Sequence, residues 1–308
     1  MLSILIPVYN FNIVSLVNEL HRQAVKADVP FEIIVLDDRS SELLRDQNKD
    51  VSKLPGVRFI ELDKNIGRAS IRNRLTELAL YPCFLFMDCD AEIPDEQYIK
   101  RYLPYVNKQI VVCGGRIYRE EQPEEPEYML RWLYGIRREQ TVAVIRNKAP
   151  YRSFMTNNFM ISRDIMQQVR FDESITQYGH EDTLFGLELK KKCIPIIHVQ
   201  NPLIHIGLEI ASEFIRKSGE GIDNLLTLID TGKIGRNDFS DIRLLRAYDL
   251  LRKNKQVKVY RFFYNFITQA VMRNLLGSNP SMMAFDLYKL SVLTQLIKKR
   301  QSVDSLFQ

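Results

Sequence analysis

The sequence is poor in cysteine, and the few cysteines are not spaced for pairing. Only four occur among 308 residues, at positions 83, 89, 113 and 193, and none forms a Cys-x-x-Cys pair. This usage excludes a disulfide framework and a zinc knuckle, and it is typical of reduced, buried thiols in a cytosolic protein.

Long apolar runs and a secretory leader are also missing. The first residues, MLSILIPVYN, have no basic region, and Pro7 interrupts their apolar run, so no signal peptide is expected. No run of about 18 apolar residues occurs, so no membrane-spanning helix is expected. The net charge of +5 permits an anionic ligand or an acidic membrane surface, but it is too small to indicate a nucleic acid partner. We expect a cytoplasmic protein, attached at most to the inner face of a membrane.

Apolar strands and amphipathic helices alternate in the first third of the chain. The strands are continuously apolar, as strands covered on both faces are, and this pattern predicts an open, mostly parallel α/β sheet. The predicted strands are 2–8, 31–36, 57–62 and 83–87, and the predicted helices are 13–24 and 68–80. Further strands are expected at 111–118, 156–163 and 194–199, a helix at 180–192, and only helices from about residue 210 onward.

Polar residues follow the strands of this predicted sheet. Tyr9, Asp38, Asp88 and Asp90 all come where a strand ends. Ligands bind at the carboxyl ends of strands in such sheets, so these side chains should share one crevice. An Asp-x-Asp pair there suits a divalent cation such as Mg²⁺ or Mn²⁺, which prefers carboxylate and phosphate oxygens. An acidic, solvated turn is the alternative reading of the pair.

Four stretches in this order, SILIPVYN, FEIIVLDDRS, NIGRASIRN and FLFMDCDAEI, resemble the nucleotide-binding half of a family 2 glycosyltransferase with the GT-A fold. TNNFMISR and GHEDTLFGLEL extend the resemblance to about residue 207. It implies an inverting transfer of a sugar from a nucleotide diphosphate donor, usually a UDP-sugar, with Mn²⁺ or Mg²⁺. It also implies a transferase domain at 1–209, with a nucleotide-binding half at 1–115 and an acceptor half at 116–209, followed by a helical extension at 210–308.

The resemblance also implies roles for single residues. Tyr9 would pack on the base, Asp38 would accept a hydrogen bond from it, Asp88 would lie near the ribose and the metal, and Asp90 would bind the metal directly. Gly67 would allow close backbone approach, and Arg68 or Arg72 would face the diphosphate, with Arg72 alternatively bracing the strand-end acids. The donor-binding residues implied in this way are Pro7, Tyr9, Asp38, Asn65, Gly67, Arg68, Arg72 and Asp88. Arg39 stands where the family commonly has glycine, so the contacts to the base stay open.

Two further stretches bear on the metal and on the chemistry. His205 resembles the histidine that completes the metal site in several transferases of this fold, and His198 is a candidate that is better explained as structural. Inverting transfer needs one carboxylate to take the proton of the acceptor hydroxyl. We assign Asp182 as this base and Glu181 as a hydrogen-bond partner of the donor sugar or the acceptor. Acids in the first turn of a helix, which the helix dipole favours, are the alternative.

Three segments allow two readings each. Asn157 and Asn158 could contact the donor sugar or make an ordinary turn. Residues 129–138, with the only tryptophan, could form a mobile aromatic lid or belong to the core. The basic stretch 258–276 could lie on a membrane surface, or it could pack as a helical hairpin or dimer contact.

Other enzyme classes fit less well. A nucleotidyltransferase is expected to begin with a Gly-rich loop and a lysine, and a dehydrogenase needs Gly-x-Gly-x-x-Gly, and neither pattern follows the first strand. The predicted activity is therefore hexosyl or N-acetylhexosaminyl transfer to a hydroxyl of a glycan or lipid-linked acceptor, in surface polysaccharide synthesis. A non-catalytic, degenerate transferase-like module for assembly or membrane contact is the alternative. The sugar, the acceptor, the linkage and the oligomeric state are not predicted.

Overall fold

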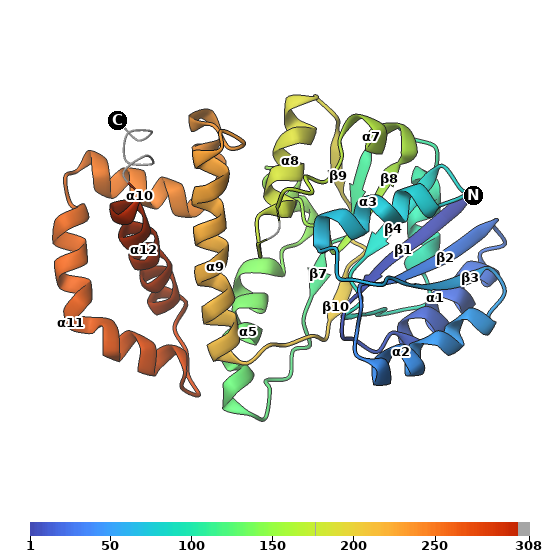
Figure 1. The fold of residues 1–308 in the computed structure, drawn as a ribbon, viewed down its shortest axis with the longest axis horizontal. Coiled ribbons are helices and arrows are strands. Elements are labelled where there is room, and N and C mark those ends of the chain that lie inside the picture. Colours follow the sequence, from blue (N-terminus) through green and yellow to red (C-terminus); the bar gives the residue numbers. More distant parts are fainter. Residues whose placement is uncertain (176, 301–308) are drawn as a thin grey trace. The chain divides into compact units, whose positions relative to one another are not determined.

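A computed structural model describes residues 1–175 and 177–300 of the chain (Figure 1). The described residues form two compact units. The first comprises residues 1–119, 139–175 and 181–207, and the second comprises 120–138, 177–180 and 208–300.

A seven-stranded, mostly parallel sheet is the centre of the first unit, as the sequence predicts. Its order is β3-β2-β1-β4-β8-β6-β9. Only β8 runs antiparallel to its two neighbours. The strands are β1 (Leu2–Val8), β2 (Phe31–Asp37), β3 (Val57–Glu61), β4 (Cys83–Met87), β6 (Val111–Cys113), β8 (Asn158–Ser162) and β9 (Ile196–His198). Every residue of β4 is buried, because helices cover both faces of the sheet.

Helices pack on the two faces through separate apolar clusters. One cluster joins the sheet to α1 (Val14–Lys26) and α4 (Tyr98–Tyr102). The other joins it to α3 (Arg68–Leu78), α7 (Arg163–Gln168) and α8 (Glu181–Lys191). The short helices α2 (Glu42–Asn48) and α6 (Ala143–Arg146) complete the helices of this unit. The start of α8 at Glu181 places the predicted catalytic acids in its first turn.

A small second sheet corrects one sequence prediction. The run 111–118 is not one strand: it divides into β6 of the large sheet and β7 (Arg116–Ile117) of a three-stranded sheet with order β5-β10-β7. Gly114 and Gly115 lie at the division, and Gly115 has a φ of 96°, which other residues rarely adopt. The remaining strands of this sheet are β5 (Ala91–Glu92) and β10 (Leu203–His205).

The described part of the second unit is helical, as predicted from residue 210 onward. Its helices are α5 (Met129–Tyr134), α9 (Ala211–Asp230), α10 (Arg243–Lys253), α11 (Val257–Leu275) and α12 (Met282–Lys299). Leu130, Phe214, Tyr264 and Phe285 belong to its shared apolar core. Trp132 is only 8% exposed, as expected of a core residue. It therefore offers no open face for a sugar ring. No helix within the described ranges is long and apolar enough to cross a membrane.

Candidate active site

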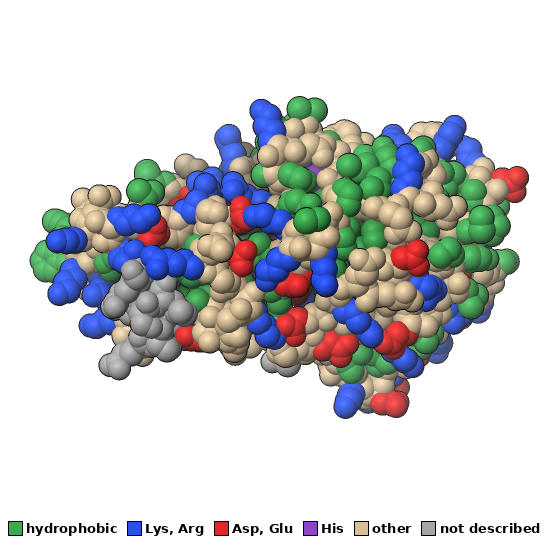
Figure 2. Space-filling view, turned by 90° about the horizontal axis from the view of Figure 1, so that it is seen from above, with side chains coloured by type: hydrophobic (Ala, Val, Ile, Leu, Met, Phe, Trp, Pro, Cys, Tyr) green, Lys and Arg blue, Asp and Glu red, His purple; other side chains and the backbone are tan. Residues whose placement is uncertain are grey.

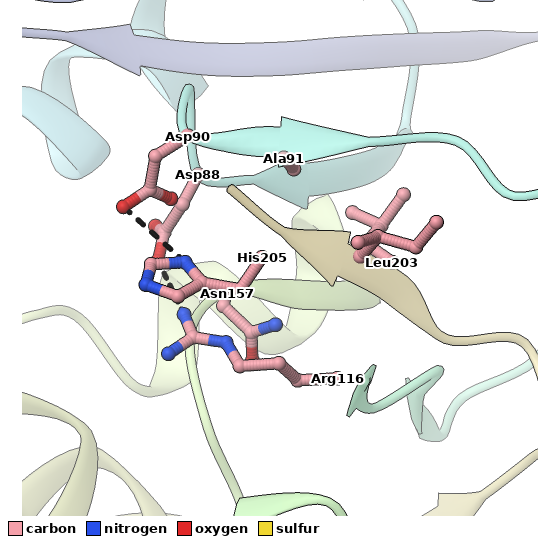
Figure 3. Close-up of a pocket in the computed structure, with 8 residues that line it drawn as sticks. Asp88, Asp90, Ala91, Arg116, Asn157, Leu203 and His205 are labelled. Atoms are coloured by element: carbon pink, nitrogen blue, oxygen red, sulfur yellow. Dashed lines mark hydrogen bonds and ion pairs between the residues drawn. The ribbon is translucent and has the colours of Figure 1, made fainter. Parts of the chain in front are cut away.

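Asp88 and Asp90, which follow β4, lie beside His205, which comes from the last segment of the first unit in the sequence (Figure 3). The small sheet brings them together, because β10 pairs with β5 and sets His205 opposite Ala91. The backbone N–H of Ile206 donates to the carbonyl of Asp90 at 2.9 Å. The Nδ1 atom of His205 is then 3.5 Å from Oδ2 of Asp90. The predicted proximity of Asp90 and His205 is thus present in the structure.

Asp88 faces two arginines. An Nη atom of Arg72 donates to Oδ1 of Asp88 at 2.8 Å, and Arg116 approaches Oδ2 at 3.3 Å. Arg72 is 4% exposed, so of its two predicted roles the bracing of the strand-end acid is the one with a contact. Within residues 1–175 and 177–300, no group of three or more His, Cys, Asp or Glu side chains is arranged to hold a metal ion. Asp88 is therefore an ion-pair partner in this structure, and its role as a metal ligand stays a prediction.

The donor atoms of the pocket nevertheless suit a divalent cation. Oδ1 of Asp90 and Oδ1 of Asn157 are both buried in residues that line the same pocket, and neither has a hydrogen-bond partner in the described part of the chain. Burying an oxygen without a partner is costly, and a hard cation would satisfy both atoms. The imidazole of His205 adds a ligand type that Mn²⁺ accepts more readily than Mg²⁺. The residues present therefore fit an oxygen-rich Mn²⁺ site.

Electrostatics keep the Asp90 carboxylate ionised. Burial raises its pKa, but the neighbouring His205, Arg116 and Arg68 outweigh burial and bring the pKa of Asp90 down to about 2. A carboxylate that stays charged at every physiological pH is the form that a cation requires.

Asn158 and His198 are structural. Both tyrosine hydroxyls of α4 donate to Oδ1 of Asn158 at 2.7 Å, and its Nδ2 donates to two backbone carbonyls. This occupies the whole amide, so Asn158 has no group left for a donor sugar, unlike its neighbour Asn157. The ring nitrogens of His198 lie 2.8 Å from Arg146 and 2.9 Å from the Pro150 carbonyl, as expected of a structural histidine.

The predicted catalytic acids have opposite environments. Glu181 lies 3.4 Å from Arg68, and although burial raises its pKa, the charges of Arg68 and Arg72 lower it overall. For Asp182, burial and the charge of Glu181 raise the pKa to about 6. When two adjacent acids have separated pKa values, the acid with the lower pKa stays charged and the acid with the higher pKa can accept a proton. Arg72 acts on both acids and also contacts Asp88, so it links this pair to the metal pocket.

The predicted base-binding residues lie at the ends of β1 and β2. Tyr9 is 55% exposed and its ring is accessible, whereas Pro7 is half-buried in β1. The carboxylate of Asp38 accepts from the backbone N–H groups of Ile66 at 2.7 Å and Gly67 at 3.0 Å. Any contact between Asp38 and a nucleotide base must therefore use the remaining lone pairs of the Asp38 carboxylate. Asn65 donates to the Asp38 carbonyl at 3.1 Å.

Two backbone positions shape this side of the site. Gly67 has a φ of 82°, and a Cβ atom there would meet no described protein atom within 4 Å, so the space next to this glycine is open. Arg39 adopts a φ of 69°, the left-handed conformation that a glycine would take without strain. Arg39 therefore keeps the turn that the family commonly makes with glycine, but its own backbone is strained.

Arg116, Glu139 and Gly207 belong to the site and were not predicted. Arg116 also contacts Glu139 at 3.2 Å, and Tyr118 donates to the same carboxylate. A Cβ atom at Gly207 would lie 2.8 Å from Asp90, so only glycine leaves that carboxylate in place. The sequence offers one signal for Gly207, its position two residues after His205. It offers no signal that Arg116 belongs to the site, because Arg116 lies within the predicted strand 111–118.

The mostly parallel sheet, its strand order and the C-terminal helices are those of a protein with the GT-A fold. S. aureus TarS residues 1–349 shares this fold with a TM-score of 0.51 at 16% identity, covering 97% of this chain and 91% of TarS. The mannosyltransferase PcManGT from Pyrobaculum calidifontis, solved with GDP-Man and Mn²⁺, gives 0.53 at 13% identity, covering 99% and 83%. The family model "Glycosyl transferase family 2" matches residues 3–170, and the chain belongs to this family.

Curated relatives match a shorter part of the chain. A chondroitin synthase of Pasteurella multocida is 27% identical over 228 residues, which is 62% of this chain and 23% of the relative. A teichoic acid poly(glycerol phosphate) polymerase of Staphylococcus epidermidis is 32% identical over 189 residues, which is 60% of this chain and 25% of the relative. The chain thus spans about a quarter of the length of these relatives.

Proposed function

We propose that residues 1–209 transfer a hexose or N-acetylhexosamine, with inversion, from a nucleotide diphosphate donor to a hydroxyl of a glycan or lipid-linked acceptor in surface polysaccharide synthesis. The observation that carries the proposal is the position of Arg72, which contacts Asp88 next to the Asp90 pocket and also acts through its charge on Glu181 and Asp182. It sets a cation-binding acid and an acid of raised pKa in one unit, as one displacement requires.

The donor is proposed to be a UDP-sugar. TarS has been crystallised with UDP-GlcNAc, and PcManGT with GDP-Man, so GDP-sugars are the second donor class to test. The exposed ring of Tyr9 offers a stacking surface for a base, and the open space over Gly67 admits a diphosphate. Arg68, whose side chain is 58% exposed, supplies a positive charge beside that space.

Each residue then has a stated task. Asp90, His205 and Asn157 would hold Mn²⁺ or Mg²⁺, which when bound supplies positive charge to stabilise a leaving diphosphate. Arg72 fixes Asp88 and lowers the pKa of Glu181, and Glu181 in turn raises that of Asp182. Asp182 accepts the proton of the acceptor hydroxyl at its carboxylate.

The test is nucleotide release from a panel of UDP- and GDP-sugars, with Mn²⁺ or with EDTA. We expect slow, metal-dependent release from a UDP-hexose that is lost in Asp90→Asn. Asp182→Asn should retain UDP binding while turnover falls by about two orders of magnitude or more, the usual contribution of a general base. UDP binding that ignores EDTA would contradict the metal site. No release from any donor would favour the non-catalytic module.

A further inference from the structure

The helical unit contains a cavity lined by positive charge. Its volume is about 440 Å³, and residues of α10, α11, α12 and the turn between α10 and α11 surround it. Five of its nine lining residues are cationic, and none is acidic: Arg252, Lys255, Lys258, Arg261 and Lys298. Lysine and arginine side chains gather over the helical unit on the face that Figure 2 shows.

Four of these five cations have no counter-ion among the residues that the structure describes. Arg252 pairs with Asp249 at 3.3 Å. Across residues 1–175 and 177–300, no acid forms an ion pair with Lys255, Lys258, Arg261 or Lys298. Like charges that face one cavity repel one another, and an anion in the cavity would relieve that repulsion. Four cations around this volume suit a group with several negative oxygens, such as a phosphate ester.

The adjoining face of α11 is apolar and open. Phe262, Phe263 and Phe266 are 59%, 63% and 73% exposed, and the ring of Phe262 contacts the other two rings. Tyr264 and Leu275 on the opposite face of the helix are buried in the core of the unit. At 3.6 residues per turn, Lys258 and Arg261 fall along the edge between these two faces. Helices that lie in a membrane interface have this combination of exposed aromatic residues and flanking cations.

We propose that the cavity and the aromatic face of α11 together bind a membrane surface, with anionic lipid phosphates in the cavity and the phenylalanines among the acyl chains. The charge of the cavity selects phosphate, and the adjoining aromatic rings select a lipid over a free phosphate. The inference does not depend on the transfer chemistry, because every residue it uses lies in the helical unit.

Sedimentation of the full chain with vesicles tests the proposal. We expect binding to phosphatidylcholine vesicles that contain phosphatidylglycerol, and little binding to phosphatidylcholine alone. A basic residue at an anionic surface contributes about fivefold in binding, so Lys258→Gln/Arg261→Gln should weaken it about 25-fold. Phe262→Ser/Phe266→Ser should also weaken it. Lys148→Gln/Lys192→Gln removes two exposed lysines of the first unit and should leave binding unchanged.

Several results would overturn the proposal. The first is equal binding to both vesicle types. The second is a loss of vesicle binding in the Lys148/Lys192 control as large as that in Lys258→Gln/Arg261→Gln. The third is pyrophosphate binding that needs Lys258 and Arg261 without any vesicle binding. Self-association lost in Phe262→Ser/Phe266→Ser, without vesicle binding, would assign the face to a second copy of the chain. Nucleotide release without vesicles should be normal in all three double variants, which separates this inference from the proposed function.

Discussion

Replacing Asp182 with asparagine should lower turnover by about two orders of magnitude or more and, at neutral pH, stabilise the first unit. Burial and the charge of Glu181 hold the pKa of Asp182 at about 6, against an ordinary value of 3.8. A folded-state pKa raised by about two units means that the ionised form costs about 3 kcal/mol of stability once the pH exceeds both values. Asparagine carries no charge and keeps an oxygen for the 2.7 Å hydrogen bond from the Thr183 N–H.

The sign of this effect depends on pH. Below about pH 4 the carboxyl is protonated in the folded and the unfolded chain, so the wild type and Asp182→Asn should be equally stable. As the pH rises from about 4 to about 6, the wild type loses stability relative to the variant, and above about 6 the difference levels off. We expect a difference of about 1–3 kcal/mol at pH 7.5, measured by denaturant unfolding of the first unit. A variant that is less stable than the wild type at pH 7.5 would refute the raised pKa.

The same pKa should set the pH profile of turnover. A base must be ionised, so kcat/KM should rise with pH to a plateau above about 6. Glu181→Gln removes the neighbouring charge and should move the rise to lower pH. The matched control is Glu77→Gln, an acid on α3 that faces Arg74 and Arg170, which should leave the profile unchanged. A rise that stays near pH 6 in Glu181→Gln would separate Asp182 from the chemistry.

Four other substitutions give expected outcomes. Gly207→Ala should weaken Mn²⁺-dependent nucleotide binding about tenfold by calorimetry, because the new methyl would lie 2.8 Å from Asp90, and unchanged affinity would contradict this contact. Asn158→Ala should cost about 3 kcal/mol or more in unfolding experiments, since it leaves several buried groups unpaired. Asn157→Ala should cost much less stability but reduce Mn²⁺ affinity. If Asn157→Ala costs more stability than Asn158→Ala, and Asn158→Ala is the variant with reduced Mn²⁺ affinity, the two asparagines have the opposite roles. Arg39→Gly should stabilise the fold by about 1 kcal/mol by relieving its left-handed backbone, and a loss of stability would show that the arginine makes a compensating contact.

The order of the first strands and helices was predictable because their signals are local. A buried parallel strand such as β2 is a continuous apolar run closed by polar residues, and α1 shows helical spacing of its apolar positions. The carboxyl ends of parallel strands lie at one edge of a sheet, so the neighbourhood of Tyr9, Asp38 and Asp88 followed from the order alone.

The interior of the site was less predictable because it depends on contacts between distant segments. The pairing of β10 with β5 joins residues more than a hundred positions apart, and only family resemblance pointed to His205. The run 111–118 predicts a single strand because its composition is strand-like on both sides of Gly114 and Gly115. Asn157 and Asn158 are identical in type, and only the structure separates a pocket oxygen from a fully bonded core amide.

The placement of Asp88 between Arg72 and Arg116 has a consequence for the order in which ligands enter. Because Asp88 is already paired with two guanidinium groups, a divalent ion arriving alone gains little attraction from that carboxylate, and a diphosphate arriving alone meets the ionised Asp90. The two together bring almost no net charge, so each should enhance the other's affinity, and by thermodynamic linkage the factor is the same in both directions. With the proposed donor and metal, the pocket would thus favour a preformed salt of metal and sugar nucleotide over either component.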